Sequence, residues 1–381
     1  MLRKILTFFQ KETVLSISAI LAILSMFIVH PSGKYFSYID FRTLSLLFCL
    51  MSIVAGLSEI GLFDYLAEKI LSRANSIKSI IVLLVLLCFF FSMIITNDVA
   101  LITFVPFAII ILKKMSEKQK NYWILRTVVM QTIAANLGSM LTPIGNPQNL
   151  YLYARANMSA LALIRLMLPY SIAALVLLLV WIQVAAHREP VSTTENHISE
   201  LFSIHKAKAP NQTSLIGYLI LFLICLLVVA HIIDYRISFI LVIGYIFFKN
   251  WHLFKKVDYS LLLTFTALFI FIGNLKCIPQ FNHFLISIID GHETLTAILS
   301  CQIISNVPAA ILLSGFTKNY SALIIGTNIG GLGTLIASMA SLISFKYIAK
   351  EKTTLRGKYF MMFTIANIVF LILLLLCINL L

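Results

Sequence analysis

Four apolar runs in this sequence are each long enough to cross a lipid bilayer as an α-helix. They occupy residues 13–29, 166–186, 214–230 and 359–376. The hydrocarbon core of a bilayer is about 30 Å thick, and a helix of roughly 20 apolar residues spans it. Overall, 60% of the 381 residues are hydrophobic, whereas soluble domains contain about 45–50% apolar residues. No alternating strand pattern of a membrane barrel occurs, so the sequence predicts an all-α polytopic membrane protein.

The charge of the chain and the positions of its cysteines exclude several classes of function. The formal net charge of +14 is typical of a membrane protein whose Lys and Arg residues gather in cytoplasmic loops. No soluble stretch carries a basic patch interleaved with aromatic residues, so no nucleic-acid partner is expected. The six cysteines form no CxxC or Cys/His cluster, so neither a metal centre, a cofactor nor a disulfide framework is predicted. The basic start lacks a small-residue cleavage site, so the first helix is predicted to be retained.

Two apolar segments are interrupted by similar polar motifs, "MIITNDVALITF" and "QIISNVPAAILL". The apolar stretches that follow the motifs are short. At 1.5 Å per residue a helix would rise about 21 Å from Val99 to Leu112, and about 12 Å from Ala309 to Phe316. Neither length crosses a bilayer. Each segment is therefore predicted to form a re-entrant helical hairpin, which enters the membrane and leaves it on the same side.

The distribution of positive charge supports this topology. With hairpins at 77–112 and 293–316 and the N-terminus inside, most of the 29 Lys and Arg residues fall on the inner face. If only the first hairpin spanned, the basic loop 113–126 would lie outside, against the positive-inside rule. We therefore expect a multi-pass protein of the cytoplasmic (inner) membrane with a cytoplasmic N-terminus and an extracytoplasmic C-terminus. Spanning helices are predicted near 13–29, 40–57, 123–150, 166–186, 214–231, 236–248, 257–275, 320–345 and 358–380.

The chain reads as two repeats, residues 1–186 and 214–381, joined by a polar cytoplasmic linker at 187–213. "YIDFRTLSLL" in the first repeat matches "KVDYSLLLTF" in the second, and "NLGSMLTPI" matches "NIGGLGTLI". Amphipathic stripes within 59–74 and 279–289 predict helices along the membrane surface. The matched helices run in opposite directions in the predicted topology. Inverted repeats with polar breaks at corresponding places are typical of a secondary transporter whose site lies at the repeat interface.

Each repeat also contains a predicted broken helix, at 123–150 and at 320–345. The first carries "NLGSMLTPIGNPQNLYLY". It is predicted to unwind near 141–148 and to restart near Asn149, because proline removes amide donors and glycine permits turns. Broken helices persist in lipid only around a buried or wet cavity. The freed carbonyls suit a hard cation such as Na⁺, and the restarting N-terminus offers amides to an anion.

The hairpin tips would supply the remaining groups of the site. Asp98 is the one carboxylate well inside an apolar segment, and its repeat counterpart is Val307. An intramembrane acid suggests cation coupling or proton carriage, and a cap of the outgoing helix is an equally good interpretation. A single such motif would favour interhelical hydrogen bonding, but four motifs in repeat register favour a site. The predicted substrate- and ion-binding residues are Thr96, Asn97, Asp98, Asn136, Gly138, Thr142, Pro143, Gly145, Asn146, Pro147, Asn149, Ser305, Asn306, Thr327, Asn328, Gly330 and Thr334, with Na⁺ expected near Asn97 and Asn136 and near Asn306 and Asn328.

The segments that carry these motifs resemble the ion transporter superfamily of divalent anion/sodium symporters, citrate and arsenite permeases, and one branch of Na⁺/H⁺ antiporters. The resemblance implies a homodimer in which hairpins and broken helices form a mobile transport part, while the remaining helices form a scaffold. In the sodium-coupled carboxylate branch, Ser-Asn-Thr triplets at both tips contact substrate and sodium. Here the corresponding triplets are Thr96-Asn97-Asp98 and Ser305-Asn306-Val307, which is closer to the arsenite and citrate permeases.

The predicted function is secondary active transport of a small anion, an organic carboxylate or an inorganic oxyanion, coupled to Na⁺ or H⁺ by an elevator-type motion. Two alternatives share the fold: a Na⁺/H⁺ antiporter and an arsenite-type efflux permease. An enzyme is not expected, because the histidines lie in loops or at helix ends and the deep acid is single. A primary pump is not expected either, because no GxxxxGK[ST] loop is present.

Overall fold

The computed structural model describes residues 12–189, 209–351 and 355–380, and over these residues it contains helices and no strands. Eight of the described helices are long and apolar enough to cross a membrane, or nine if one bent pair counts as a span. The predicted all-α polytopic architecture is confirmed. Most of the predicted linker 187–213 lies outside the described residues.

The described helices follow the predicted order along the chain. In the first half they are α2 (Thr13–Ile28), α3 (Tyr35–Tyr38), α4 (Phe41–Glu59), α5 (Leu62–Leu71), α6 (Ile77–Ile95), α7 (Asn97–Lys113), α8 (Glu117–Gly138), η1 (Ser139–Leu141), α9 (Pro147–Ala156) and α10 (Ala160–His187). In the second half they are α12 (Gln212–Val229), α13 (Tyr235–Asn250), η2 (Trp251–Lys256), α14 (Tyr259–Lys276), α15 (Pro279–Ile289), α16 (Glu293–Ile304), α17 (Asn306–Leu313), α18 (Tyr320–Ile329), α19 (Met339–Glu351) and α20 (Leu355–Leu380).

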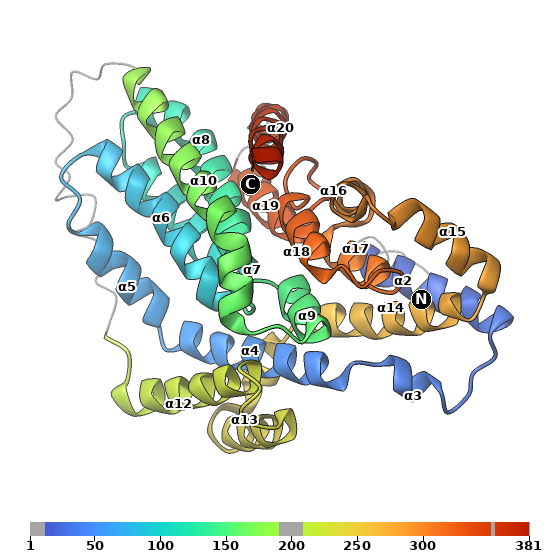
Figure 1. Cartoon of the computed structure of the whole chain (residues 1–381). Helices are drawn as coiled ribbons and strands as arrows, with labels where there is room; N and C mark the ends of the chain where they lie inside the picture. Colours follow the sequence, from blue (N-terminus) through green and yellow to red (C-terminus); the bar gives the residue numbers. More distant parts are fainter. Residues whose placement is uncertain (1–11, 190–208, 352–354, 381) are drawn as a thin grey trace, which may run out of the picture.

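The helices gather into two groups that meet at α9 and at α19, which packs on α7 and α8. In the first half α6, α7 and α8 pack against one another, and in the second α16, α17 and α18 do the same (Figure 1). The short helix α9 contacts both α17 and α18, so the end of the first broken helix lies against the second half. α4 packs on α12 and α13, while α14 packs along α2.

The helices α4 and α14, which the sequence pairs as repeat counterparts, begin in the same way. The Asp40 carboxylate caps α4 by accepting a hydrogen bond from the Thr43 amide at 3.0 Å, and the Asp258 carboxylate caps α14 by accepting one from the Leu261 amide at 3.0 Å. The φ/ψ angles of the two caps are −83°/85° and −79°/84°. An aspartate at this position satisfies amides that the first helical turn leaves unpaired.

Each hairpin segment is split at a single residue. α6 ends at Ile95 and α7 begins at Asn97, while α16 ends at Ile304 and α17 begins at Asn306. The outgoing helices start earlier than the expected starts at Val99 and Ala309. The Thr96 and Ser305 carbonyls already close the first turn by accepting from the amides of Ala100 and Ala309, both at 3.1 Å. α6 is by itself long and apolar enough to cross a membrane, so the re-entrant path of the first hairpin stays a prediction.

The first broken helix restarts earlier than expected. α8 ends at Gly138, η1 continues to Leu141, and α9 begins at Pro147 rather than near Asn149. Proline suits the first turn of a helix, where its missing amide donor would be unpaired in any case. The Asn146 side chain caps the new helix by accepting a hydrogen bond from the Asn149 amide at 2.9 Å. In the second half α18 ends at Ile329 and α19 begins at Met339.

The two predicted amphipathic helices are present as α5 and α15. α5 lies between α4 and α6 in the chain and contacts both, and α15 links α14 to α16. α15 meets α16 at 109°, and this bent pair is the one counted above as a broken span or a re-entrant loop. Their position on the membrane surface stays a prediction.

Glycines at corresponding positions let each broken helix approach its hairpin closely. A Cβ on Gly138 would lie 2.0 Å from the backbone oxygen of Phe89 in α6. A Cβ on Gly330 would lie 2.9 Å from the Cα of Ile298 in α16. Phe89 and Ile298 each stand seven residues before their tip residue, so the two close approaches occur at the same place in each half.

Alanine at Gly138 is expected to destabilise the protein, because the new methyl group would press on backbone rather than on a movable side chain. Overpacking of this kind costs about 1–3 kcal/mol, so the melting temperature in detergent should fall by several degrees. Gly244→Ala in α13 is the control, since a Cβ there meets no atom within 4 Å. That variant should melt at the wild-type temperature or slightly above it. Equal melting of Gly138→Ala and wild type would contradict the close approach.

Candidate substrate and ion site

The two hairpin tips share an uncommon backbone conformation. Thr96 has φ 75° and ψ 152°, and Ser305 has φ 72° and ψ 158°. Positive φ is strained for residues other than glycine and is found where surrounding structure fixes the chain, often at functional sites. These two residues are the ones that the sequence aligns as the first members of the tip triplets.

Each tip is fastened to the break of its own half by equivalent hydrogen bonds. The Asn97 amide donates to the Gly145 carbonyl at 3.1 Å, and the Asn306 amide donates to the Ala337 carbonyl at 3.0 Å. The side-chain oxygen of each asparagine then accepts from the next amide in the chain at 2.9 Å. The predicted ligands Asn97 and Asn306 therefore hold the tips in place and bring their amide groups to the centre.

The two broken helices cross-link each other through a reciprocal pair of hydrogen bonds. Asn146 Nδ2 donates to Asn328 Oδ1 at 3.0 Å, and Ser338 Oγ donates to Asn136 Oδ1 at 3.0 Å. Asn146 stands just before α9, and Ser338 stands just before α19. Each bonds to the asparagine that precedes the break in the other half. All four side chains are buried.

A second reciprocal pair reinforces the first. Asn328 Nδ2 donates to Asn149 Oδ1 at 2.6 Å, and Asn136 Nδ2 donates to Ser341 Oγ at 3.5 Å. Ser341 stands three residues beyond Ser338, just as Asn149 stands three beyond Asn146. The two halves are therefore joined by two equivalent pairs of hydrogen bonds. In the second pair, the bond between Asn328 and Asn149 is shorter than the bond between Asn136 and Ser341. We call these two reciprocal pairs the amide network.

The first hairpin is tied to this network more directly than the second. Asn97 Nδ2 donates to Asn136 Oδ1 at 3.1 Å. Among the described residues no equivalent bond joins Asn306 to Asn328. A Cβ on Gly331 would lie 3.3 Å from Asn306 Nδ2, so the second tip amide lies beside the backbone of the break instead.

The carbonyls freed by the breaks are bonded to side-chain amides. Asn149 Nδ2 donates to the Met140 carbonyl at 3.1 Å and to the Thr142 carbonyl at 3.2 Å. In the second half Gln302 Nε2 donates to the carbonyls of Gly330 and Leu332, both at 2.9 Å. The sequence reasoning missed Gln302 as a partner of the second break, and its signal is a polar side chain one turn before the second tip.

Several predicted ligands serve to fasten the breaks. The Thr142 hydroxyl donates to the Met93 carbonyl, and the Thr334 hydroxyl donates to the Gln302 carbonyl at 3.2 Å, which is the equivalent contact in the other half. The Thr327 hydroxyl bonds within its own helix. The remaining predicted residues of the breaks, which pack there without side-chain hydrogen-bonding groups, are Gly138, Pro143, Gly145, Pro147 and Gly330.

Asp98 lines a cavity beside the amide network. The cavity has a volume of about 210 Å³ and lies between α4, the first hairpin tip and the start of α9; Asp258 and Lys256 also line it. The Asp98 Oδ1 atom is buried and has no hydrogen-bond partner among the described residues. Asp98 occupies the first turn of α7, where the helix dipole favours a negative charge. Asp98 is therefore a carboxylate with an unpaired oxygen in a residue that lines the cavity.

Residues 5–320 match the family model described as citrate transporter, which covers most of the chain. The chain belongs to the citrate transporter family. It is therefore a multi-pass membrane transporter, and the ion transporter superfamily to which its motifs point is confirmed.

Its relatives include two proteins of similar length. An uncharacterized transporter of Methanocaldococcus jannaschii, MJ0456, is 33% identical over 332 residues, which are 87% of each chain. The inner membrane protein YbiR of Escherichia coli is 31% identical over 85% of this chain and 84% of its own. The human P protein is 30% identical over 128 residues, which make up 33% of this chain and 15% of the P protein.

Removal of Asn328 is expected to cost more stability than removal of Ser341, although the two residues take part in equivalent bonds. Asn328→Ala leaves the buried Asn149 oxygen without its 2.6 Å donor, and an unpaired buried polar group costs about 1–3 kcal/mol. Ser341→Ala removes only a 3.5 Å contact. Thermal unfolding in detergent should rank the variants in that order, and equal melting temperatures would contradict the network as described.

Proposed function

We propose that the chain is a secondary active transporter that carries a small anion, an organic carboxylate or an inorganic oxyanion, coupled to Na⁺ or H⁺. Membership of the citrate transporter family supports the transport role. We place the binding site where the two broken helices meet. The observation that supports this location is the amide network, which joins the broken helices of both halves in the buried core. Side-chain amides can donate to anion oxygens through nitrogen and ligate a cation through oxygen.

The arrangement of elements also supports alternating access by an elevator-type motion. The Asp98 cavity separates α4 from the first hairpin tip and α9, so the hairpins and broken helices meet the remaining helices across a partly open boundary. A transport part that slides along this boundary would carry the amide network from one side to the other. The homodimer, the cytoplasmic membrane and the cytoplasmic N-terminus belong to the same proposal.

Asn97→Ala tests whether the network binds the anion. In proteoliposomes, currents driven by citrate, succinate or sulfate under Na⁺ or pH gradients should fall roughly tenfold or more, since a hydrogen bond to a charged group contributes about 1.5–3 kcal/mol. Asn121→Ala, an exposed asparagine of the neighbouring helix α8, is the control and should transport normally. A wild-type protein that carries none of these anions, or an Asn97→Ala variant with normal currents and normal melting, would overturn the proposal.

A Na⁺/H⁺ antiporter of the same fold is the second candidate, and the unpaired buried oxygen of Asp98 favours it. In that case Asp98→Asn should abolish currents driven by cation and pH gradients alone. Asp258→Asn is the matched control, because Asp258 lines the same cavity and asparagine caps a helix as well as aspartate does. An Asp98→Asn protein that keeps anion exchange but loses gradient-driven accumulation would assign the coupling ion to Asp98 and keep the anion permease.

A further inference from the structure

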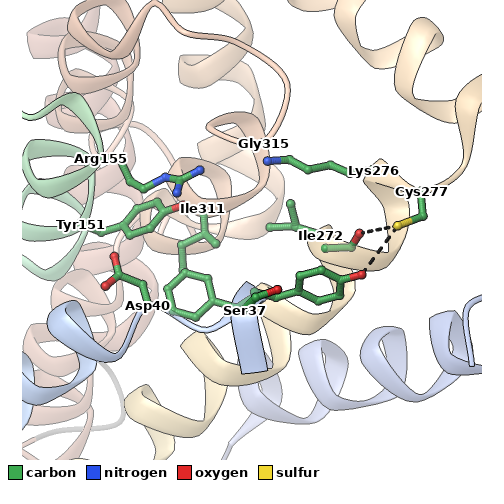
Figure 2. Close-up of a pocket in the computed structure, with 12 residues that line it drawn as sticks. Ser37, Asp40, Tyr151, Arg155, Ile272, Lys276, Cys277, Ile311 and Gly315 are labelled. Atoms are coloured by element: carbon green, nitrogen blue, oxygen red, sulfur yellow. Dashed lines mark hydrogen bonds between the residues drawn. The ribbon is translucent and has the colours of Figure 1, made fainter. Parts of the chain in front are cut away.

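A second cavity, of about 260 Å³, lies on the boundary between α14 and the transport elements α9 and α17. Figure 2 shows two basic side chains that extend into it, Arg155 from α9 and Lys276 from the end of α14. Tyr38, Tyr151 and Cys277 form further parts of the wall. We call it the basic cavity. It is separate from the amide network and from the Asp98 cavity.

The basic cavity is the repeat counterpart of the Asp98 cavity. When Asp40 is aligned with Asp258, the α4 residues that line the Asp98 cavity align with the α14 residues that line the basic cavity. α4 lines the Asp98 cavity with Met51, Val54, Ala55 and Ser58, and the counterparts in α14 that line the basic cavity are Phe269, Ile272, Gly273 and Lys276. The two halves therefore build one cavity twice, and a lysine in the second replaces a serine in the first.

The two cations of the basic cavity have no acidic partner. Over the described residues neither Arg155 nor Lys276 makes a hydrogen bond or an ion pair. The one carboxylate in the wall, Asp40, accepts from the Thr43 amide and hydroxyl at 3.0 and 2.8 Å. Two like charges held beside one cavity repel each other, and an anion between them would relieve that repulsion.

Glycines shape the cavity around these side chains. A Cβ on Gly315 would lie 2.7 Å from Ile272 and 3.1 Å from Cε of Lys276, so the missing side chain leaves room for the lysine stem. A Cβ on Gly273 would lie 2.2 Å from the Tyr38 ring, so the ring rests directly on the α14 backbone. The Tyr38 hydroxyl reaches the Cys277 sulfur at 3.6 Å (Figure 2).

We propose that the basic cavity is a docking site for the transported anion, a carboxylate or oxyanion held by Arg155 and Lys276 before it reaches the amide network. The inference rests on the proposed function. The arginine fork can hold two oxygens of one anion, and the lysine adds a point charge. Because Arg155 belongs to the transport part and Lys276 to the scaffold, a bound anion would bridge the two parts and leave when they slide apart.

Cys277 provides a direct test, because its thiol is exposed in the cavity wall. The experiment uses purified protein that carries Cys377→Ser. The rate at which the Cys277 thiol reacts with anionic 2-sulfonatoethyl methanethiosulfonate is compared with the rate at which it reacts with the neutral methyl reagent. Arg155→Gln and Lys276→Gln should each lower the anionic-to-neutral ratio about threefold, the effect of one unit charge several ångströms away in water. Arg165→Gln, an exposed cation outside the cavity, should leave the ratio unchanged. Citrate at constant ionic strength should slow the neutral reagent in wild type and not in the double variant.

The docking site would be overturned if the anionic-to-neutral ratio stayed the same in both Arg155→Gln and Lys276→Gln. It would also be overturned if citrate did not change the rate of the neutral reagent in wild type. Transport currents separate this failure from failure of the proposed function. If both hold, Arg155→Gln raises the KM for the anion several-fold with little change in kcat, as loss of uniform binding does. If no anion drives a current in any variant while Cys277 still responds to Arg155 and citrate, the proposed function fails, and only anion binding in the basic cavity stands.

Discussion

Backbone groups that lose their helical partners inside a membrane must find new ones, and this constraint organises the centre of the molecule. The first break is satisfied by Asn149 and the second by Gln302, one placed after its break and the other on the hairpin. Both fasteners are neutral amides. In the proposed site, therefore, no fixed charge of these fasteners would hold a substrate too tightly to release.

The two halves share a frame and differ in the charges placed on it. The tips have the same backbone conformation and the breaks use the same reciprocal bonds. However, Val307 stands at the position that corresponds to Asp98, and Lys276 at the position that corresponds to Ser58. One cavity thereby becomes acidic and its counterpart basic. In a symmetric elevator both ends of the path would be alike. We infer that these substitutions suit the two cavities to different ions, the basic cavity to an anion and the Asp98 cavity to a cation or a proton.

Much of the fold could be predicted from particular residues, and the bonding of the site could not. Proline and glycine placed the first break to within a few residues, and the Asn motifs identified both tips. The hairpins match at one offset, Asn97 with Asn306, and the broken helices at another, Asn136 with Asn328. Contacts between the halves therefore follow no single register, which is why Ser338 was missed. Gln302 bonds within its own half, and it was missed because the apolar Met93 stands at its position in the first hairpin. The cavities escaped prediction as well, because Arg155 comes close to Lys276 only when α9 packs against the second half.

The central claim is that two inverted, re-entrant hairpins meet from opposite sides of the membrane, and the sidedness of their ends tests it most directly. Single cysteines would replace Arg73, Lys114, His292 and Lys318, all exposed, in a chain whose Cys277 and Cys377 are serine. A membrane-impermeant maleimide would then be applied to intact cells. The account predicts that cysteines at 292 and 318 react while those at 73 and 114 react only after lysis. Reaction at one end of a hairpin and protection at its other end would show that the segment spans the membrane and would contradict the account.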